Sequence, residues 1–173
     1  MKKLMLLFLA VALFLGIPVQ KVQAQASVTA QAFAEVIAAI TATEISQLNF
    51  GRFLPEEQGG QIHLSPQGVL YTSGTLALSG GIRNPASFYI TGENNATFSV
   101  TLPSGPAILT NVANAKTMMV SGWESVPAAG TSAGILNGGS FAVNVGATLT
   151  VGSMNDNPVG IYSGTYSITF AYN

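Results

Sequence analysis

After its first 26 residues the chain alternates short runs of apolar and β-branched residues with clusters of Gly, Pro, Asn and Ser. Evenly spaced short strands separated by such turn signals are typical of an all-β sandwich. We expect turns at residues 55–60, 79–86, 91–95, 102–106, 127–134, 137–139 and 155–158. Between them the pattern predicts strands near 36–46, 61–64, 69–78, 86–91, 97–102, 117–123, 140–145, 147–152 and 161–172.

The final segment, "GIYSGTYSITFAYN" at 160–173, has the clearest alternation. In a strand, successive side chains point to opposite faces, so every second residue shares a face. One face then carries Tyr162, Gly164, Tyr166, Ile168, Phe170 and Tyr172, and the other carries mainly Ser, Thr and Ala. We therefore expect one long strand that covers a core with its aromatic face.

The segment "ASVTAQAFAEVIAAITATEI" at 26–45 is ambiguous. Its alanines would allow a helix over 30–40. Its many β-branched residues, and the alternation of Val28, Ala30, Ala32, Ala34 and Val36, favour extended backbone. We expect a strand from about residue 36 and an N-terminal extension at 27–36 before the domain at 37–173.

Residues 1–26 have the features of a secretory signal peptide. Lys2 and Lys3 precede the apolar run "LMLLFLAVALFLGI", and small residues offer cleavage after Ala24 or Ala26. A retained membrane anchor is the alternative, although the run is short for a bilayer span. The sequence thus predicts export through the inner membrane, with transit through the periplasm to the cell surface or medium, and no stable membrane insertion.

Charge and cysteine content narrow the function further. Three basic residues (Arg52, Arg83 and Lys116) and seven acidic residues follow the signal, a net charge of −4. Without a basic patch, nucleic acid is not an expected partner. The weakly charged surface suits packing against other protein copies, or simply a neutral secreted domain. The chain has no Cys, which excludes disulfides and thiol chemistry and leaves burial and strand pairing to stabilise the fold.

Candidate catalytic and metal-binding residues are sparse. His63 is the only histidine, and we expect it on a strand surface rather than in a catalytic triad. Glu56 and Glu57 are interpreted as solvated turn charges, not as the paired carboxylates of a glycosidase. The "NDNP" at 155–158 lacks the spacing of a calcium loop, and Trp123 is expected in or near the core rather than as a sugar platform. We predict no enzyme, no cofactor and no metal.

Several segments resemble the bacterial domain of unknown function 4402, in the order expected for that family. They are "ITATEISQLNFGRF" (40–53), "FYITGENNATFSVTLP" (88–103), "MMVSGW" (118–123), "LNGGSFAVNVGATLTVG" (136–152) and "PVGIYSGTYSITFAYN" (158–173). That family is in turn similar to spore coat protein U-type domains and to pilins of the archaic chaperone–usher class, which share an "LxFG" strand and a final Tyr-containing strand.

The resemblance implies an immunoglobulin-like, pilin-like antiparallel sandwich with an incomplete sheet edge. In pilins a chaperone fills this gap, and the N-terminal extension of the next subunit then replaces it by β-strand addition. The penultimate aromatic and the Gly fourteen residues from the end of many pilins correspond to Tyr172 and Gly160. The implied subunit or chaperone edge comprises Gly160, Tyr162, Tyr166, Ile168, Phe170 and Tyr172, and the implied donor strand comprises Val28, Ala30, Ala32, Ala34 and Val36.

Two functions follow from these patterns. The first is a structural subunit of a bacterial surface fibre or fimbria, whose partners are other copies or related subunits, a periplasmic chaperone and an outer-membrane usher. The alternative is a self-contained adhesin that binds glycan or host protein through loops at 91–95, 127–134 and 153–158, with residues 27–36 paired in its own sheet or loose.

Overall fold

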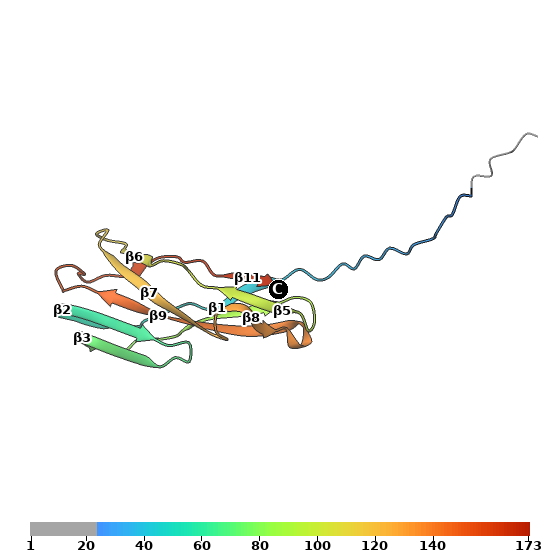
Figure 1. Ribbon diagram of the computed structural model, residues 1–173. Coiled ribbons are helices and arrows are strands. Elements are labelled where there is room, and N and C mark those ends of the chain that lie inside the picture. The colour runs from blue at the N-terminus through green and yellow to red at the C-terminus, as the bar shows by residue number, and fades with distance from the viewer. Residues whose placement is uncertain (1–23) are drawn as a thin grey trace, which may run out of the picture. The chain divides into compact units, whose positions relative to one another are not determined.

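The computed structural model describes residues 24–173, so most of the predicted signal peptide, residues 1–23, lies outside the described part (Figure 1). Within this part the chain is all-β and every strand pairing is antiparallel; its one helix is the short 3₁₀ turn Asn137–Gly139. The predicted all-β antiparallel sandwich is confirmed. The strands are β1 (Thr41–Ser46), β2 (Phe53–Leu64), β3 (Leu70–Leu78), β4 (Ala86–Thr91), β5 (Thr97–Thr101), β6 (Ala107–Asn111), β7 (Thr117–Val126), β8 (Gly130–Ile135), β9 (Ser140–Val151), β10 (Tyr162–Ser163) and β11 (Thr169–Tyr172).

The strands form two sheets. The larger, eight-stranded sheet has the order β1-β4-β9-β7-β6-β10, with β2 placed between β9 and β3. The smaller sheet has the order β11-β5-β8. No helix among residues 24–173 has both the length and the apolarity that a membrane span requires.

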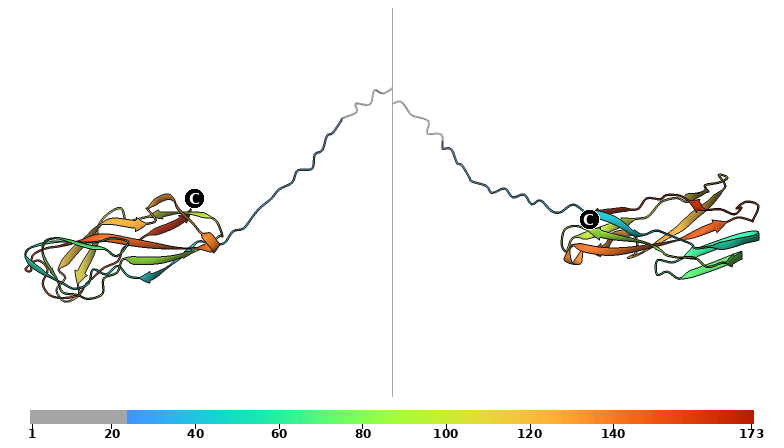
Figure 2. Two further views of the ribbon diagram at one scale, coloured as in Figure 1. Left: turned by 90° about the horizontal axis from the view of Figure 1, so that it is seen from below. Right: turned by 180° about the vertical axis from the view of Figure 1, so that it is seen from behind.

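Strand β9 connects the two ends of the domain, and Figure 2 shows it running through the domain in both views. Its first half pairs with β4, as in Ala86↔Val145, and its second half pairs with β2, as in Leu64↔Ala147. Two strands were predicted here, at 140–145 and 147–152, and the structure has one. Gly146 lies within this strand, where the close approach of the Leu64 carbonyl leaves no room for a side chain.

Two buried clusters lie on the inward face of β9. The β2–β7 core comprises Phe50, Ile62, Leu64, Met118, Val120, Ala147, Leu149 and Val151. The β4–β5 core comprises Ala86, Ile90, Phe98, Val100, Leu136, Val143 and Val145. Alternate β9 residues enter each cluster, as a period of two requires.

The prediction of one continuous strand at 161–172 is wrong. Two short strands form instead, because β10 pairs with β6 of the larger sheet and β11 pairs with β5 of the smaller sheet. Residues 164–168 cross between the sheets and belong to no strand. Strands that change sheets bend at such corners.

Other predicted boundaries also need correction. The expected turn at 55–60 is a bulge inside β2, where the register with β3 shifts between Pro55 and Gly60. Residues 36–40 are not strand. Strand β6 was not predicted, and β8 lies where a turn at 127–134 was expected. The small residues of β8 suggested a loop, but they are needed because Gly134 packs directly on the Phe98 ring.

Candidate functional site

Two edge strands flank the β4–β5 core. Within the described residues, β1 pairs only with β4 and β11 pairs only with β5. Each strand therefore has one side whose backbone N–H and C=O groups face no neighbouring strand. Such edges are templates for pairing with another chain.

A groove lies between these two edges. Ile40, Thr41 and Ala42 line it on the β1 side, and Ile168, Thr169 and Phe170 line it on the β11 side. Its volume is about 270 Å³. We call it the β1/β11 groove. It joins the two edge strands, so a single extended segment placed in it would meet both.

The β11 wall of the groove is an inward-facing row that is only partly covered. Tyr166, Ile168, Phe170 and Tyr172 are half-buried and alternate with exposed residues, as the sequence predicted for this segment. All four pack against the β4–β5 core, and the Phe170 ring lies 5.8 Å from the Phe88 ring of β4. By contrast, Val143 and Val145 in the same core are fully buried. The row thus faces a core yet remains accessible from one side.

The β1 wall is more exposed still. Ala42 lies directly opposite Ile90 in the ladder, so the two side chains share a face. Ile90 is fully buried whereas Ala42 is exposed. Nothing within the described domain covers the inward face of β1 at this position.

Three hydrogen bonds close one end of the groove around Ala38. The Tyr172 hydroxyl donates to the Ala38 carbonyl oxygen (2.8 Å) and accepts from the Glu93 backbone N–H (2.6 Å). The Ala38 N–H donates to the Glu93 carboxylate (3.0 Å). Gly92 lies directly below the hydroxyl, where a Cβ would collide with it. We call Tyr172, Glu93 and the Ala38 backbone the clasp.

Tyr166 lies where the two cores meet. Its ring packs at a tilt against the Trp123 ring, with 4.7 Å between the ring centroids. Trp123 packs against both cores, and its Nε1 donates to the Gly105 carbonyl (3.1 Å). The Tyr166 hydroxyl is buried and has no hydrogen-bond partner in the described structure. Burial raises the pKa of Tyr166 to about 12, and the negative charge of Glu44 on β1 acts in the same direction.

The predicted edge residues do not all lie at the groove. Ile168 and Phe170 line it, and Tyr172 closes its end, but Tyr162 packs on the β2–β7 core and donates to the Pro158 carbonyl (2.9 Å). Gly160 packs against the amide of the buried Asn111, which leaves no room for a Cβ. Sequence spacing grouped these residues because they share one segment, whereas the change of sheet separates them.

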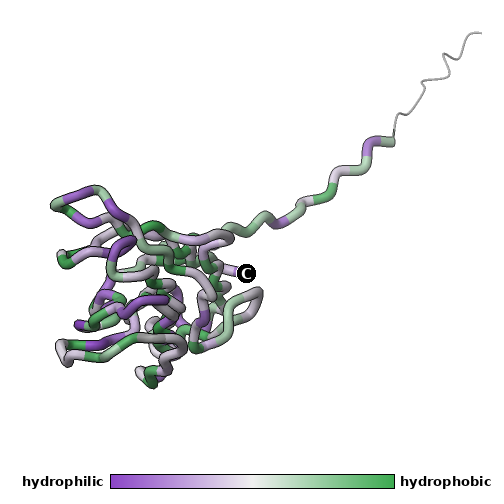
Figure 3. The backbone as a smooth tube through the Cα atoms, turned by 90° about the vertical axis from the view of Figure 1, so that its left-hand side faces the viewer, coloured by the Kyte–Doolittle hydropathy of each residue, from purple (hydrophilic) through white to green (hydrophobic). Residues whose placement is uncertain are grey.

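The predicted donor strand forms no strand in the structure. Val28 and Val36 are 91% and 98% exposed, and Phe33 between them is 91% exposed. Figure 3 shows hydrophobic and hydrophilic residues interleaved along this segment. Its apolar side chains are therefore exposed.

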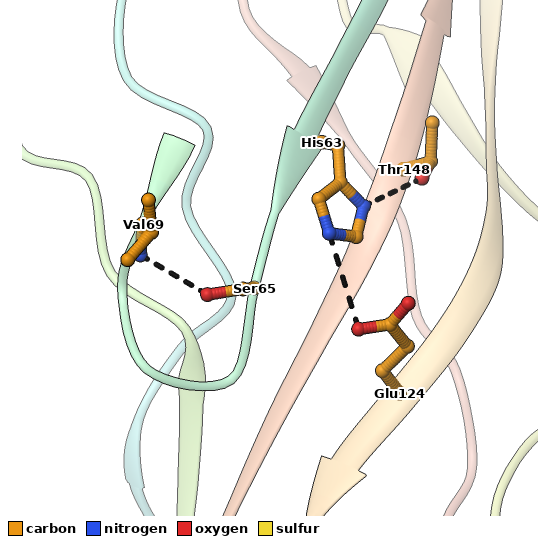
Figure 4. A network of polar contacts seen from close by, with 5 residues as sticks. All are labelled: His63, Ser65, Val69, Glu124 and Thr148. Atoms are coloured by element: carbon orange, nitrogen blue, oxygen red, sulfur yellow. Dashed lines mark hydrogen bonds and ion pairs between the residues drawn. The ribbon is translucent and has the colours of Figure 1, made fainter. Parts of the chain in front are cut away.

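His63 lies on the outer face of the larger sheet, away from the groove residues. Its Nδ1 is 3.0 Å from the Thr148 hydroxyl, and its Nε2 is 3.9 Å from the Glu124 carboxylate (Figure 4). The centroid of its ring is 5.9 Å from that of Tyr71. Tyr71 and Thr148 are its direct cross-strand neighbours. The contacts form a cross-strand row of the kind that stabilises sheets.

Two of the three loops proposed for recognition, 91–95 and 153–158, bond several of their polar side chains internally. Asn94 accepts from the Gly138 N–H (2.9 Å), and Glu93 belongs to the clasp. In the loop at 153–158, the Ser153 hydroxyl donates to the Asp156 carboxylate (2.7 Å), and this hydrogen bond lowers the pKa of Asp156. The buried Asn157 donates to the Thr117 carbonyl (2.8 Å). These side chains hold the loops in shape.

A family model described as "domain of unknown function (DUF4402)" matches residues 40–172. The chain belongs to the DUF4402 family. The match begins at Ile40 and ends at Tyr172, so it includes both walls of the groove of this DUF4402 domain. Comparison with curated proteins and with solved structures found no match.

Proposed function

We propose that this protein is an exported structural subunit of a bacterial surface fibre, assembled by β-strand complementation. The β1/β11 groove receives residues 27–36 of a second copy. The single observation that carries the proposal is that both sheets end in an unpaired strand on the two sides of one apolar groove. We also propose that this domain is similar to spore coat protein U-type domains and to archaic chaperone–usher pilins.

The inserted strand adds two kinds of stabilisation. Its backbone extends the smaller sheet beyond β11 through main-chain hydrogen bonds, which give affinity in β-augmentation. Its alternate side chains, Val28 through Val36, cover the half-buried row of Ile168 and Phe170. At about 25 cal/mol per Å² of apolar surface removed from water, this burial favours the complex.

The proposal also indicates which partners the subunit needs during export. An open groove and an exposed apolar extension would aggregate in transit, so the subunit needs a chaperone that fills the groove in the periplasm and an outer-membrane usher that exchanges it for the next extension. The partners are thus other copies or related subunits together with this machinery, and the final location is the cell surface.

The loops argue against the alternative of a self-contained adhesin. Glu93, Asn94, Ser153 and Asp156 bond within the chain. The groove, by contrast, has unpaired backbone edges and uncovered apolar side chains. These contacts support strand addition over ligand binding by the loops at 91–95 and 153–158.

Peptide binding tests the proposal. The compact unit, residues 36–173, is mixed with a synthetic peptide of residues 25–36, and thermal unfolding is recorded. We expect the peptide to raise the melting temperature by several degrees, since a ligand that binds only the folded state stabilises it by mass action. A peptide of scrambled order serves as the control. No shift and no binding at millimolar peptide would refute strand complementation.

A matched pair of variants locates the binding site. Ala42→Arg places a long charged side chain in the groove, and Thr72→Arg places one on β3, another edge strand of the larger sheet. Both residues are exposed, and each lies opposite a fully buried isoleucine, Ile90 and Ile62 respectively. We expect A42R to weaken peptide binding at least about tenfold, whereas T72R binds as the wild type does. Equal weakening by both would place the peptide elsewhere.

A further inference from the structure

Two identical segments could fill the groove, because every copy carries residues 27–36. One is the extension of the same copy, and the other is the extension of a second copy. Only residues 37–40 separate that segment from β1, which begins at Thr41. Loops of two to five residues are sufficient for a β-hairpin. Chain length alone would therefore allow the extension to fold back beside β1 and fill the groove of its own copy.

The clasp acts on the middle of that would-be hairpin loop. Ala38 has its N–H bound by the Glu93 carboxylate and its C=O bound by the Tyr172 hydroxyl. Glu93 lies in the loop between β4 and β5, and Tyr172 lies at the end of β11. Both backbone groups of one residue are thus fixed by side chains from two other parts of the domain, and residues 36–40 form no turn.

The clasp is itself well anchored. The Tyr172 hydroxyl accepts from the Glu93 backbone N–H at 2.6 Å while it donates to Ala38. Its ring packs on the β4–β5 core, and the absence of a side chain on Gly92 gives the hydroxyl its place. Because Tyr172 continues the half-buried row of β11, the residue that fixes Ala38 also belongs to the wall that the donor strand would cover.

We propose that the clasp determines which copy complements the groove: by fixing Ala38 it prevents the hairpin and reserves the groove for the extension of a second copy. This inference rests on the proposed function. Tyr172 is then a specificity-determining residue for assembly, and its hydroxyl, rather than its ring, carries that role.

The test uses Tyr172→Phe in the mature chain, residues 27–173, at a dilution where the chain is monomeric. Fluorescently labelled peptide 25–36 is titrated by anisotropy. Y172F keeps the ring but loses two of the three hydrogen bonds, so its own extension can enter the groove and compete. We expect peptide binding to weaken about tenfold or more, which corresponds to the net contribution of two hydrogen bonds.

A second chain separates competition from damage. When residues 27–36 are deleted from Y172F, the competitor is gone and we expect wild-type peptide affinity to return. Tyr89→Phe, which removes the hydroxyl of an exposed tyrosine on β4 outside the clasp and the groove, is the matched control and should bind the peptide as the wild type does.

The outcomes are distinct. Wild-type affinity in full-length Y172F would overturn the role of the clasp while leaving strand complementation intact. Weak binding that persists after deletion of the extension would also overturn it, because Tyr172 would then only build the groove. Failure of the wild-type domain without its extension to bind peptide at all would instead refute the proposed function.

Discussion

The β2–β7 core and the β4–β5 core share strand β9 but differ in how they are covered. Around the first core, Ile62 and Leu64 are fully buried, and β2 has a partner strand on each side. Around the second core, β1 and β11 are both edges, and Ile168 and Phe170 lie half-exposed beside a groove. One sequence thus builds a finished end and an unfinished end. Because β3 and β10 are edge strands beside the first core, the difference lies in the groove between β1 and β11 and not in the number of edge strands.

The largest expected effect on stability comes from shortening one isoleucine at each end of the domain. Ile62→Ala removes a fully buried side chain from the β2–β7 core and should cost about 2–5 kcal/mol of unfolding free energy. Ile168→Ala removes a half-buried side chain at the groove and should cost about 1–2 kcal/mol. Urea unfolding of the domain without its extension measures both. Equal costs in the free domain would mean that the two ends are equally complete.

Bound peptide sharpens the same comparison. If residues 25–36 cover the row of Ile168, the cost of Ile168→Ala should rise when saturating peptide is present, whereas the cost of Ile62→Ala should not change. The measurement is a double-mutant-style cycle with peptide as the second perturbation. A peptide that stabilises both variants to the same extent would contradict its placement in the groove.

A smaller effect tests the close packing at the finished end. Gly160→Ala forces a Cβ against the Asn111 amide and should cost about 1–3 kcal/mol. Gly105→Ala is the matched control, since a Cβ there would meet nothing within 4 Å, and its effect should stay within about 0.5 kcal/mol. Peptide affinity should be unchanged in both. If G160A weakened peptide binding, the peptide-binding site would have to reach the finished end as well.

The free energy of unfolding should fall at alkaline pH because of Tyr166, which lies at the boundary between the two cores. The pKa of Tyr166 is raised to about 12, so the folded state holds a proton that the unfolded chain releases near pH 10. The stabilisation is fully present below pH 10 and is lost as pH rises from 10 toward 12. Urea unfolding at pH 9 and pH 11.5 measures the loss, and Tyr166→Phe should show a smaller one. An identical pH dependence in both proteins would contradict the burial of this hydroxyl.

The smallest effect concerns the outer face. His63→Ala removes the contact with Thr148 and should cost about 0.2–1 kcal/mol, the range of cross-strand pairs. Thr148→Val, which removes the hydroxyl alone, should account for much of that cost. Peptide affinity should be the same in both variants as in the wild type. A change in peptide affinity would mean that the outer face of the sheet affects binding at the groove.

The sequence predicted the fold class and the alternating face of the last segment, because both depend on local patterns. It could not predict that this segment changes sheets, since residues 164–168 are determined by which strands lie nearby. Strand β8 was missed because the close approach of Gly134 to Phe98 requires small residues, which on their own suggest a loop. The clasp was missed as well, because Tyr172, Glu93 and Ala38 meet only in the folded domain.

Cysteine cross-linking between copies tests the central claim most directly, since the natural chain has no Cys. One mature chain carries Ala32→Cys in the extension, and a second carries Ala42→Cys in the groove. Mixed under mild oxidation, the two should form a heterodimeric disulfide, whereas A32C mixed with Thr72→Cys on β3 should not. Equal cross-linking to both positions, or none to Ala42→Cys, would contradict the account that a second copy completes the unfinished end.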